Sequence, residues 1–98
     1  MLFAIIFTDK PDHAELRAAH LQAHIDWLEQ NKDVVPIAGS LRHAPGEAAK
    51  GGLWIAEADS RAQIEALIQT DPFFAAGLRQ SYEILHWSKA NSARKVLI

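Results

Sequence analysis

The residues of this chain best suited to chemistry are an arginine and two histidines at helical spacing. Arg17, His20 and His24 follow one another at intervals of three and four residues, which places them on one face of a helix. A helix that only filled a core would carry Leu or Ala there, because buried ionisable groups lower stability unless they are paired. We therefore expect this face to form the wall of a small-molecule pocket. The apolar flanks beside it are Ala14, Ala18, Leu21, Ile25 and Leu28, and Leu16, Ala23 and Trp27.

Each of these three residues allows more than one interpretation. The imidazole of His24 can act as a general acid or base near neutrality, or it could be a buried histidine bonded to a backbone carbonyl. Arg17 could hold a carboxylate or phenolate of a ligand, or form a salt bridge with an acidic residue of a partner subunit or of the second helix. The interval between His20 and His24 also suits metal ligands. Because the chain has neither cysteine nor an HExxH glutamate, we expect no metal ion and no cofactor.

The composition argues against several classes of protein. The 98 residues are 49% hydrophobic and carry a formal net charge of −2, which indicates one globular domain over residues 1–98. The lysines and arginines are scattered, so we expect no nucleic-acid partner. No apolar run approaches the ~20 residues needed to span a bilayer, and no targeting segment is evident. We therefore expect a cytoplasmic protein without membrane contact.

Hydrophobic periodicity predicts the order strand, helix, strand, strand, helix, strand. The strands are expected at residues 2–8, 34–42, 53–58 and 82–87, and the helices at residues 11–31 and 60–68, with a short helical turn from residue 72 and a further short strand at 95–98. Asp12 with Glu15, and Ser60 with Gln63, are expected to form the capping boxes that begin the two helices. This order predicts a ferredoxin-like α+β fold, in which an antiparallel sheet carries helices on one face.

The strands at residues 2–8 and 53–58 are apolar at both alternations. The second face of the sheet is therefore not obviously solvated. Two such sheets packed face to face would cover it, which predicts a homodimer. The apolar strand at residues 95–98 could then extend the sheet of the partner.

Three stretches of the chain carry a resemblance to a known family. They are Arg17 followed by His24-Ile25-Asp26-Trp27-Leu28, of the form R…HLxxL, then Ala38-Gly39-Ser40-Leu41, similar to AGPL, and residues 71–78, DPFFAAGL, similar to a DPFxxAGL signature. In this order and spacing the chain resembles the YciI-like (YCII-related) proteins over residues 2–87. The resemblance implies a ferredoxin-like fold that pairs into a dimeric α/β barrel, with His24 and Asp71 in the positions of the family's histidine and aspartate. Ser40 stands where the family has proline, and His20 lies outside the family pattern.

The resemblance and the polar helix face lead to one main hypothesis, a cofactor-independent small-molecule enzyme of lyase or isomerase type. His24 would be the general base or acid, and Asp71 would orient it. Asp71 could instead be only a helix N-cap, a common role for Asp before Pro. The alternative for the whole protein is a non-catalytic dimeric module that binds a small metabolite or acts as an accessory protein. The residues expected to bind a small anionic or phenolic substrate are Arg17, His20, Ser40 and Phe73.

Overall fold

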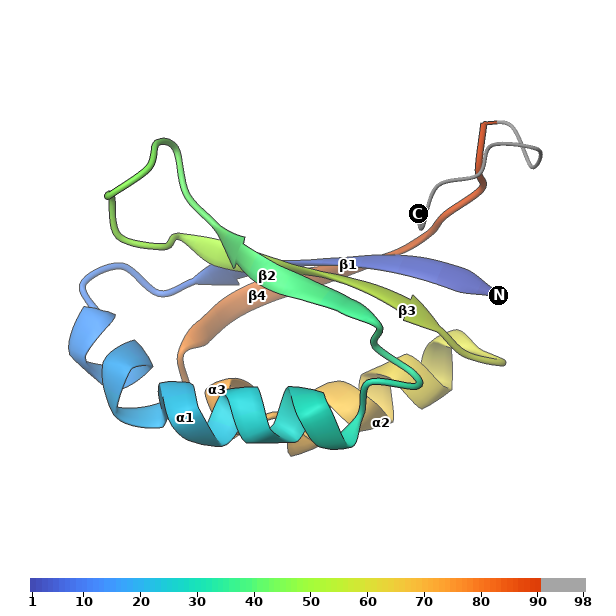
Figure 1. The fold of residues 1–98 in the computed structure, drawn as a ribbon, viewed down its shortest axis with the longest axis horizontal. Helices are drawn as coiled ribbons and strands as arrows, with labels where there is room; N and C mark the ends of the chain where they lie inside the picture. Colours follow the sequence, from blue (N-terminus) through green and yellow to red (C-terminus); the bar gives the residue numbers. More distant parts are fainter. Residues whose placement is uncertain (91–98) are drawn as a thin grey trace.

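An antiparallel sheet with three helices beneath one of its faces forms the architecture (Figure 1). The computed structural model describes residues 1–90. In chain order the elements are β1 (Leu2–Asp9), α1 (Ala14–Gln30), β2 (Ile37–Leu41), β3 (Gly51–Glu57), α2 (Arg61–Thr70), α3 (Pro72–Ala75) and β4 (Arg79–His86). The strand order is β2-β3-β1-β4, which confirms the predicted ferredoxin-like α+β fold. The strand predicted at residues 95–98 lies outside the described residues.

The inner face of the sheet packs against the helices and forms the core. Phe3, Ile5 and Phe7 alternate along β1 and are fully buried, as expected when every second side chain of a strand points to the same face. Ile5 is paired with Trp54 of β3 and Ile84 of β4, so the same face continues across the sheet. The helices complete this core with Trp27, Ile64 and Ile68.

The outer face of the sheet is largely apolar, and no helix of the described residues covers it. Strand register places the complementary alternation of each strand there. Leu41 and Leu85 on this face are 37% and 45% exposed. The strands β1 and β3 therefore carry apolar residues on both faces, as the sequence predicts for residues 2–8 and 53–58. The apolar residues of the outer face are Leu2, Ala4, Ile6, Ile37, Leu41, Leu53, Ile55 and Leu85, and its polar residues are Thr8, Glu57, Ser81 and Glu83.

Two element ends differ from the prediction for reasons that local bonding explains. The second strand begins at Ile37 and not at Val34, because the backbone N–H groups of Val34 and Val35 donate to the carbonyl of Asn31 and prolong the turn after α1. The last strand begins at Arg79, three residues before the expected start. A shift in register between β1 and β4 accompanies that early start and affects the site described below.

One of the two expected helix caps is present. Ser60 Oγ accepts a hydrogen bond from the backbone N–H of Gln63 at 3.2 Å, and the Gln63 side chain accepts from the N–H of Asp59 at 3.0 Å. The box predicted from Asp12 is wrong. Asp12 has a φ of 61°, so the chain turns once more before α1, and the N-cap is His13, which makes no side-chain capping bond.

Candidate active site

The buried residues of α1 are His24 and Trp27. The indole N–H of Trp27 donates to Thr70 Oγ1 at 2.9 Å, which ties α1 to the end of α2. Leu21 and Ile25, on the expected apolar flank, are 42% and 46% exposed. They border a cavity between α1 and the sheet rather than packing against the core. The polar face of α1 therefore turns inward while part of its apolar flank lines an opening.

His24 and Asp71 are brought together across the helix layer. The Nδ1 atom of His24 lies 2.7 Å from Oδ1 of Asp71, and both side chains are buried. A carboxylate can only accept, so Nδ1 carries the proton and Nε2 is left with its lone pair when the ring is neutral. Within residues 1–90, Nε2 makes no hydrogen bond.

Asp71 also caps the next helix. The same Oδ1 atom accepts the backbone N–H of Phe73 at 3.1 Å, and Pro72 follows at the first helical position of α3. The two interpretations of Asp71, helix cap and partner of His24, therefore coexist on one oxygen. The other oxygen, Oδ2, is buried without a hydrogen-bond partner among the described residues.

The aromatic ring of Phe73 contacts three polar side chains, those of His24, Arg17 and Arg79. The imidazole of His24 stacks on it with 4.0 Å between ring centroids and 12° between planes. The guanidinium carbons of Arg17 and Arg79 lie 4.9 and 5.1 Å from its centroid, within the range of cation–π attraction. The Asp-Pro-Phe segment thus supplies a histidine partner, a helix start and an aromatic surface from three consecutive residues.

Arg17 forms an ion pair with Asp9 of β1 and not with an acidic residue of the second helix. Its Nε atom lies 3.3 Å from Asp9 Oδ2, at the end of β1, and its Nη2 donates to the carbonyl of Gly51 at 3.2 Å. The expected partner in the second helix is therefore corrected to Asp9 of β1. Burial lowers the pKa of the Arg17 guanidinium, while the Asp9 carboxylate opposes that shift.

Asp9 also binds Arg79, and the sequence analysis singled out neither residue. Arg79 Nη1 lies 2.6 Å from Asp9 Oδ1, and the Arg79 side chain is only 2% exposed. Between Thr8 and Asp9 the partner in β4 changes from Ser81 to Arg79, so one residue of β4 is skipped. This bulge turns Arg79 to the helix side of the sheet, whereas strict alternation from Tyr82 would turn it outward. The sequence indicates this pair only by placing two residues of opposite charge, Asp9 and Arg79, at the ends of strands.

Arg17, His24 and Arg79 border a cavity of about 210 Å³ between α1 and the sheet. Of the expected site residues, Arg17, His24 and Ser40 line it. Asp71 and Phe73 lie behind His24, and His20 is half-buried and does not line the cavity formed by the described residues. Of the two histidines of this helix face, His24 borders the cavity and His20 does not. The complete lining is Arg17, Leu21, His24, Ile25, Leu28, Ala38, Gly39, Ser40, Trp54 and Arg79.

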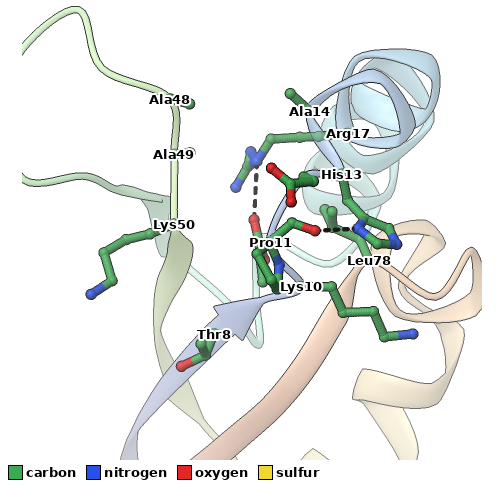
Figure 2. A pocket seen from close by; sticks show the side chains of 12 residues that line it. Thr8, Lys10, Pro11, His13, Ala14, Arg17, Ala48, Ala49, Lys50 and Leu78 are labelled. Atoms are coloured by element: carbon green, nitrogen blue, oxygen red, sulfur yellow. Dashed lines mark hydrogen bonds and ion pairs between the residues drawn. The ribbon is translucent and has the colours of Figure 1, made fainter.

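A larger groove of about 500 Å³ lies beside Arg17, between the end of β1, residues 48–50 before β3, and the start of α1. Figure 2 shows Arg17 pointing into it, with a dashed line for its ion pair to Asp9. The side chains of Lys10 and Lys50 extend away from each other in this view. His13 binds the carbonyl of Pro11 at 2.6 Å. Because its polar groups do not converge, this groove is a weaker candidate for chemistry than the cavity at His24.

The part of the chain that the structure describes holds neither a cluster of metal ligands nor a membrane-spanning helix. Within residues 1–90, no three His, Cys, Asp or Glu side chains are grouped as metal ligands would be. None of the helices in the described part of the chain is both long enough and apolar enough to cross a bilayer.

The fold and site together define a ferredoxin-like protein with a small cavity between one helix and the sheet, in which a histidine and two arginines lie among apolar side chains. The chain belongs to the YCII-related domain family, whose profile matches residues 1–88. A comparison with curated proteins finds no match.

Solved structures similar to this chain include an enzyme and two monooxygenase-type folds. The 5-chloro-2-hydroxyhydroquinone dehydrochlorinase TftG from Burkholderia phenoliruptrix AC1100, in complex with 2,5-dihydroxybenzoquinone, is 28% identical, with a TM-score of 0.81 over 90% of this chain and 94% of its own. A candidate antibiotic biosynthesis monooxygenase from Bacteroides thetaiotaomicron is 17% identical, with a TM-score of 0.55 over 98% and 94%. A further antibiotic biosynthesis monooxygenase is 11% identical, with a TM-score of 0.52 over 91% and 100%. The last two support the fold alone.

Proposed function

We propose that this protein is a small-molecule enzyme of lyase or isomerase type in which His24 moves a proton. The observation that carries the proposal is the 2.7 Å contact of His24 with Asp71 at the edge of a cavity. The contact fixes the ring so that Nε2 is the free base, and it stabilises the ring once that base has taken a proton. Arg17 and Ser40 line the same cavity and would bind the substrate. His20 has no part in the proposal, because it does not border the cavity of the described residues.

The proposed reaction begins with proton abstraction, because His24 has one ring nitrogen free to act as a base. Nε2 of His24 removes a proton from the substrate, and the electron pair of the broken bond forms a new double bond. In an elimination, a leaving group on the adjoining atom departs with its bonding pair, and the protonated imidazole later returns its proton to that anion or to solvent. In an isomerisation, the imidazole returns the proton to a different carbon. Both schemes conserve atoms and electrons and need no oxidant.

The substrate class is a small oxygenated ring. TftG acts on a chlorinated hydroxyhydroquinone and was solved with a dihydroxybenzoquinone. The cavity here combines two arginines with an indole, Trp54, and with aliphatic side chains, which suits a ring with ionisable oxygens. The volume of about 210 Å³ limits the ligand to a small molecule.

We also propose that the protein acts as a homodimer. The outer face of the sheet is apolar over β1, β2 and β3 and at Leu85 of β4, and leaving it in water forgoes about 25 cal/mol for each Å² of apolar surface that a partner would cover. A second copy presents a matching apolar sheet, so a face-to-face pair covers both outer faces at once.

The test is turnover of halogenated and unhalogenated polyhydroxybenzenes by the purified protein and by the His24→Gln variant. Glutamine keeps a donor for Asp71 but removes the base. The proposal predicts halide release or a change in ring absorbance with the wild type, and a loss of roughly 10²–10⁴-fold in the variant. Ring compounds that bind but are not turned over would favour the non-catalytic binding module. Undiminished turnover by His24→Gln would refute the mechanism.

A further inference from the structure

The hydroxyl of Ser40 is the polar side-chain group that β2 contributes to the cavity lining. Ser40 pairs with Gly52 of β3, and Gly52 pairs with Phe7 of the core, so these three positions share the helix side of the sheet. Ser40 is also exposed, and it therefore lies where the cavity opens to solvent. A ligand in the cavity can reach this hydroxyl.

Arg42 determines what the hydroxyl of Ser40 can bind. Nη2 of Arg42 donates to Ser40 Oγ, and Nη1 donates to the carbonyl of Glu47 at 2.9 Å. Because the hydroxyl oxygen already accepts from a guanidinium, its own proton is left for another acceptor. The remaining N–H groups of Arg42 make no hydrogen bond within residues 1–90, and they can serve the same acceptor. The two side chains together offer donors to a group that only accepts.

The charges that act on one another beside this opening are not balanced. Burial is the largest cause of the lowered pKa of Arg17. Next come the carboxylate of Asp9, which opposes the shift, and the guanidiniums of Arg79 and Arg42, which add to it. A smaller contribution from Asp71 opposes it. Three guanidiniums therefore face two carboxylates, and one positive charge is left over even when the neighbouring histidine is neutral.

The arginine without a counter-charge is Arg42. Asp9 pairs with both Arg17 and Arg79, and Asp71 contacts His24. In the part of the chain that the structure describes, Arg42 pairs with no carboxylate. An anion bound at Ser40 and Arg42 would supply the missing negative charge.

We propose that Ser40 and Arg42 bind a carboxylate of the substrate where the cavity opens, while the ring of the same molecule lies against Trp54. The inference rests on the proposed function and narrows its substrate class to small rings that carry a carboxylate. A carboxylate is ionised near neutral pH, has only acceptors, and matches the planar fork of a guanidinium. Its one negative charge equals the excess beside the opening. Arg42 is then a specificity-determining residue, and the carboxylate takes no part in the proton transfer.

The experiment compares the binding of 4-hydroxybenzoate with that of 4-hydroxybenzamide, which has the same ring and phenol but a neutral amide in place of the carboxylate. Affinities are measured by calorimetry at low ionic strength, where attraction between charges is screened least. The wild type is expected to bind the acid roughly 10-fold more tightly, as hydrogen bonds to a charged group at a partly exposed site allow. Arg42→Gln should lose most of this preference and keep its affinity for the amide. Ser40→Ala should lose part of the preference.

Two lysine variants control for a general effect of charge. Lys32→Gln removes an exposed cation outside the cavity lining and should keep the preference of the wild type for the acid. Lys50 lines the larger groove, so Lys50→Gln tests that alternative position. Loss of the preference in Lys50→Gln, with Arg42→Gln unaffected, would place the carboxylate in the groove and overturn the inference.

NMR of the ¹⁵N-labelled wild type makes the test independent of whether the variants fold. The Nε–H signal of Arg42 should shift when 4-hydroxybenzoate binds and stay in place when the amide binds. Equal affinity of the wild type for the two compounds, or an unmoved Arg42 signal in the acid-bound protein, would overturn the inference and leave the proposed function standing. A preference for the acid that depends on Arg42, in a protein that turns over no ring compound, would instead overturn the proposed function alone.

Discussion

His24 and Asp71, which are 47 positions apart in the chain, meet at 2.7 Å through one nitrogen and one oxygen. The same Asp71 oxygen accepts the backbone N–H of Phe73. One atom therefore both orients the histidine of α1 and begins α3. Substitutions at Asp71 separate these roles, because asparagine can still cap a helix but has no carboxylate.

We predict that Asp71→Asn and Asp71→Ala differ in stability more than in turnover. Asparagine keeps an acceptor for the Phe73 N–H, whereas alanine loses the cap, worth about 1 kcal/mol, and leaves the buried Nδ1–H of His24 unpaired, at a cost of about 1–3 kcal/mol. Urea unfolding should place the alanine variant lower. Both variants should lose turnover, since neither supplies a carboxylate to the imidazole. Full activity in Asp71→Asn would reduce Asp71 to a helix cap.

Replacing Phe73 should disturb the site more than replacing the residue beside it. Phe73→Leu removes the surface on which His24 stacks and which both arginines approach. The lost aromatic contact is worth about 0.5–1.5 kcal/mol beyond buried area. Phe74→Leu is the matched control, because Phe74 is half-buried and meets Tyr82 at 6.0 Å instead. The free energy of unfolding, measured in urea, should fall further for Phe73→Leu, and equal losses would contradict this account.

Substitution by alanine should lower the stability of the protein at one glycine of the sheet and leave it unchanged at another. A Cβ at Gly51 would lie 1.9 Å from the carbonyl oxygen of Phe7, so Gly51→Ala forces β1 and β3 apart. We expect a loss of about 3 kcal/mol or more in unfolding free energy, at the upper end of overpacking effects. Gly39→Ala on β2 meets nothing within 4 Å and should fold normally. Comparable thermal melting of the two variants would show that the close approach of β1 and β3 is wrong.

A charge on the outer face should dissociate the proposed homodimer. Leu85 is paired with Ala4 on that face, and Leu85→Lys would bury an unpaired ammonium between two sheets. Sedimentation velocity should show a monomer for this variant and a dimer for the wild type. The control is Ala66→Lys, the same change in charge on the exposed side of α2. A monomeric wild type, or a dimer unaffected by Leu85→Lys, would contradict face-to-face pairing.

The hydrophobic periodicity of the sequence was sufficient to predict the fold, because each strand and helix buries an apolar face of its own. The double alternation of β1 correctly indicated a strand with two apolar faces. Ser60 with Gln63 marked the start of α2 correctly, since that signal is local. Asp12 with Glu15 carried the same signal and failed, because the left-handed turn at Asp12 depends on how β1 joins α1.

The site was only partly accessible to sequence reasoning. His24 and Asp71 were both singled out, and the structure places them in contact. Arg79 was missed because its inward direction depends on a bulge, which is a property of strand pairing and not of any one strand. His20 carried the same signal as His24, yet a shift of one helical turn takes it out of the cavity lining. Periodicity identifies a face, whereas contacts between elements decide which residues of that face share a cavity.

The most direct measurement of the central claim is the tautomer of the His24 ring, read from the nitrogen chemical shifts of the ¹⁵N-labelled protein above the titration of its histidines. The account predicts a proton on Nδ1, held by Asp71, and an unprotonated Nε2 free to act as the base. The Asp71→Ala variant should lose this preference. A wild-type ring that carries its proton on Nε2 would contradict both the His24–Asp71 pair and the chemistry proposed from it.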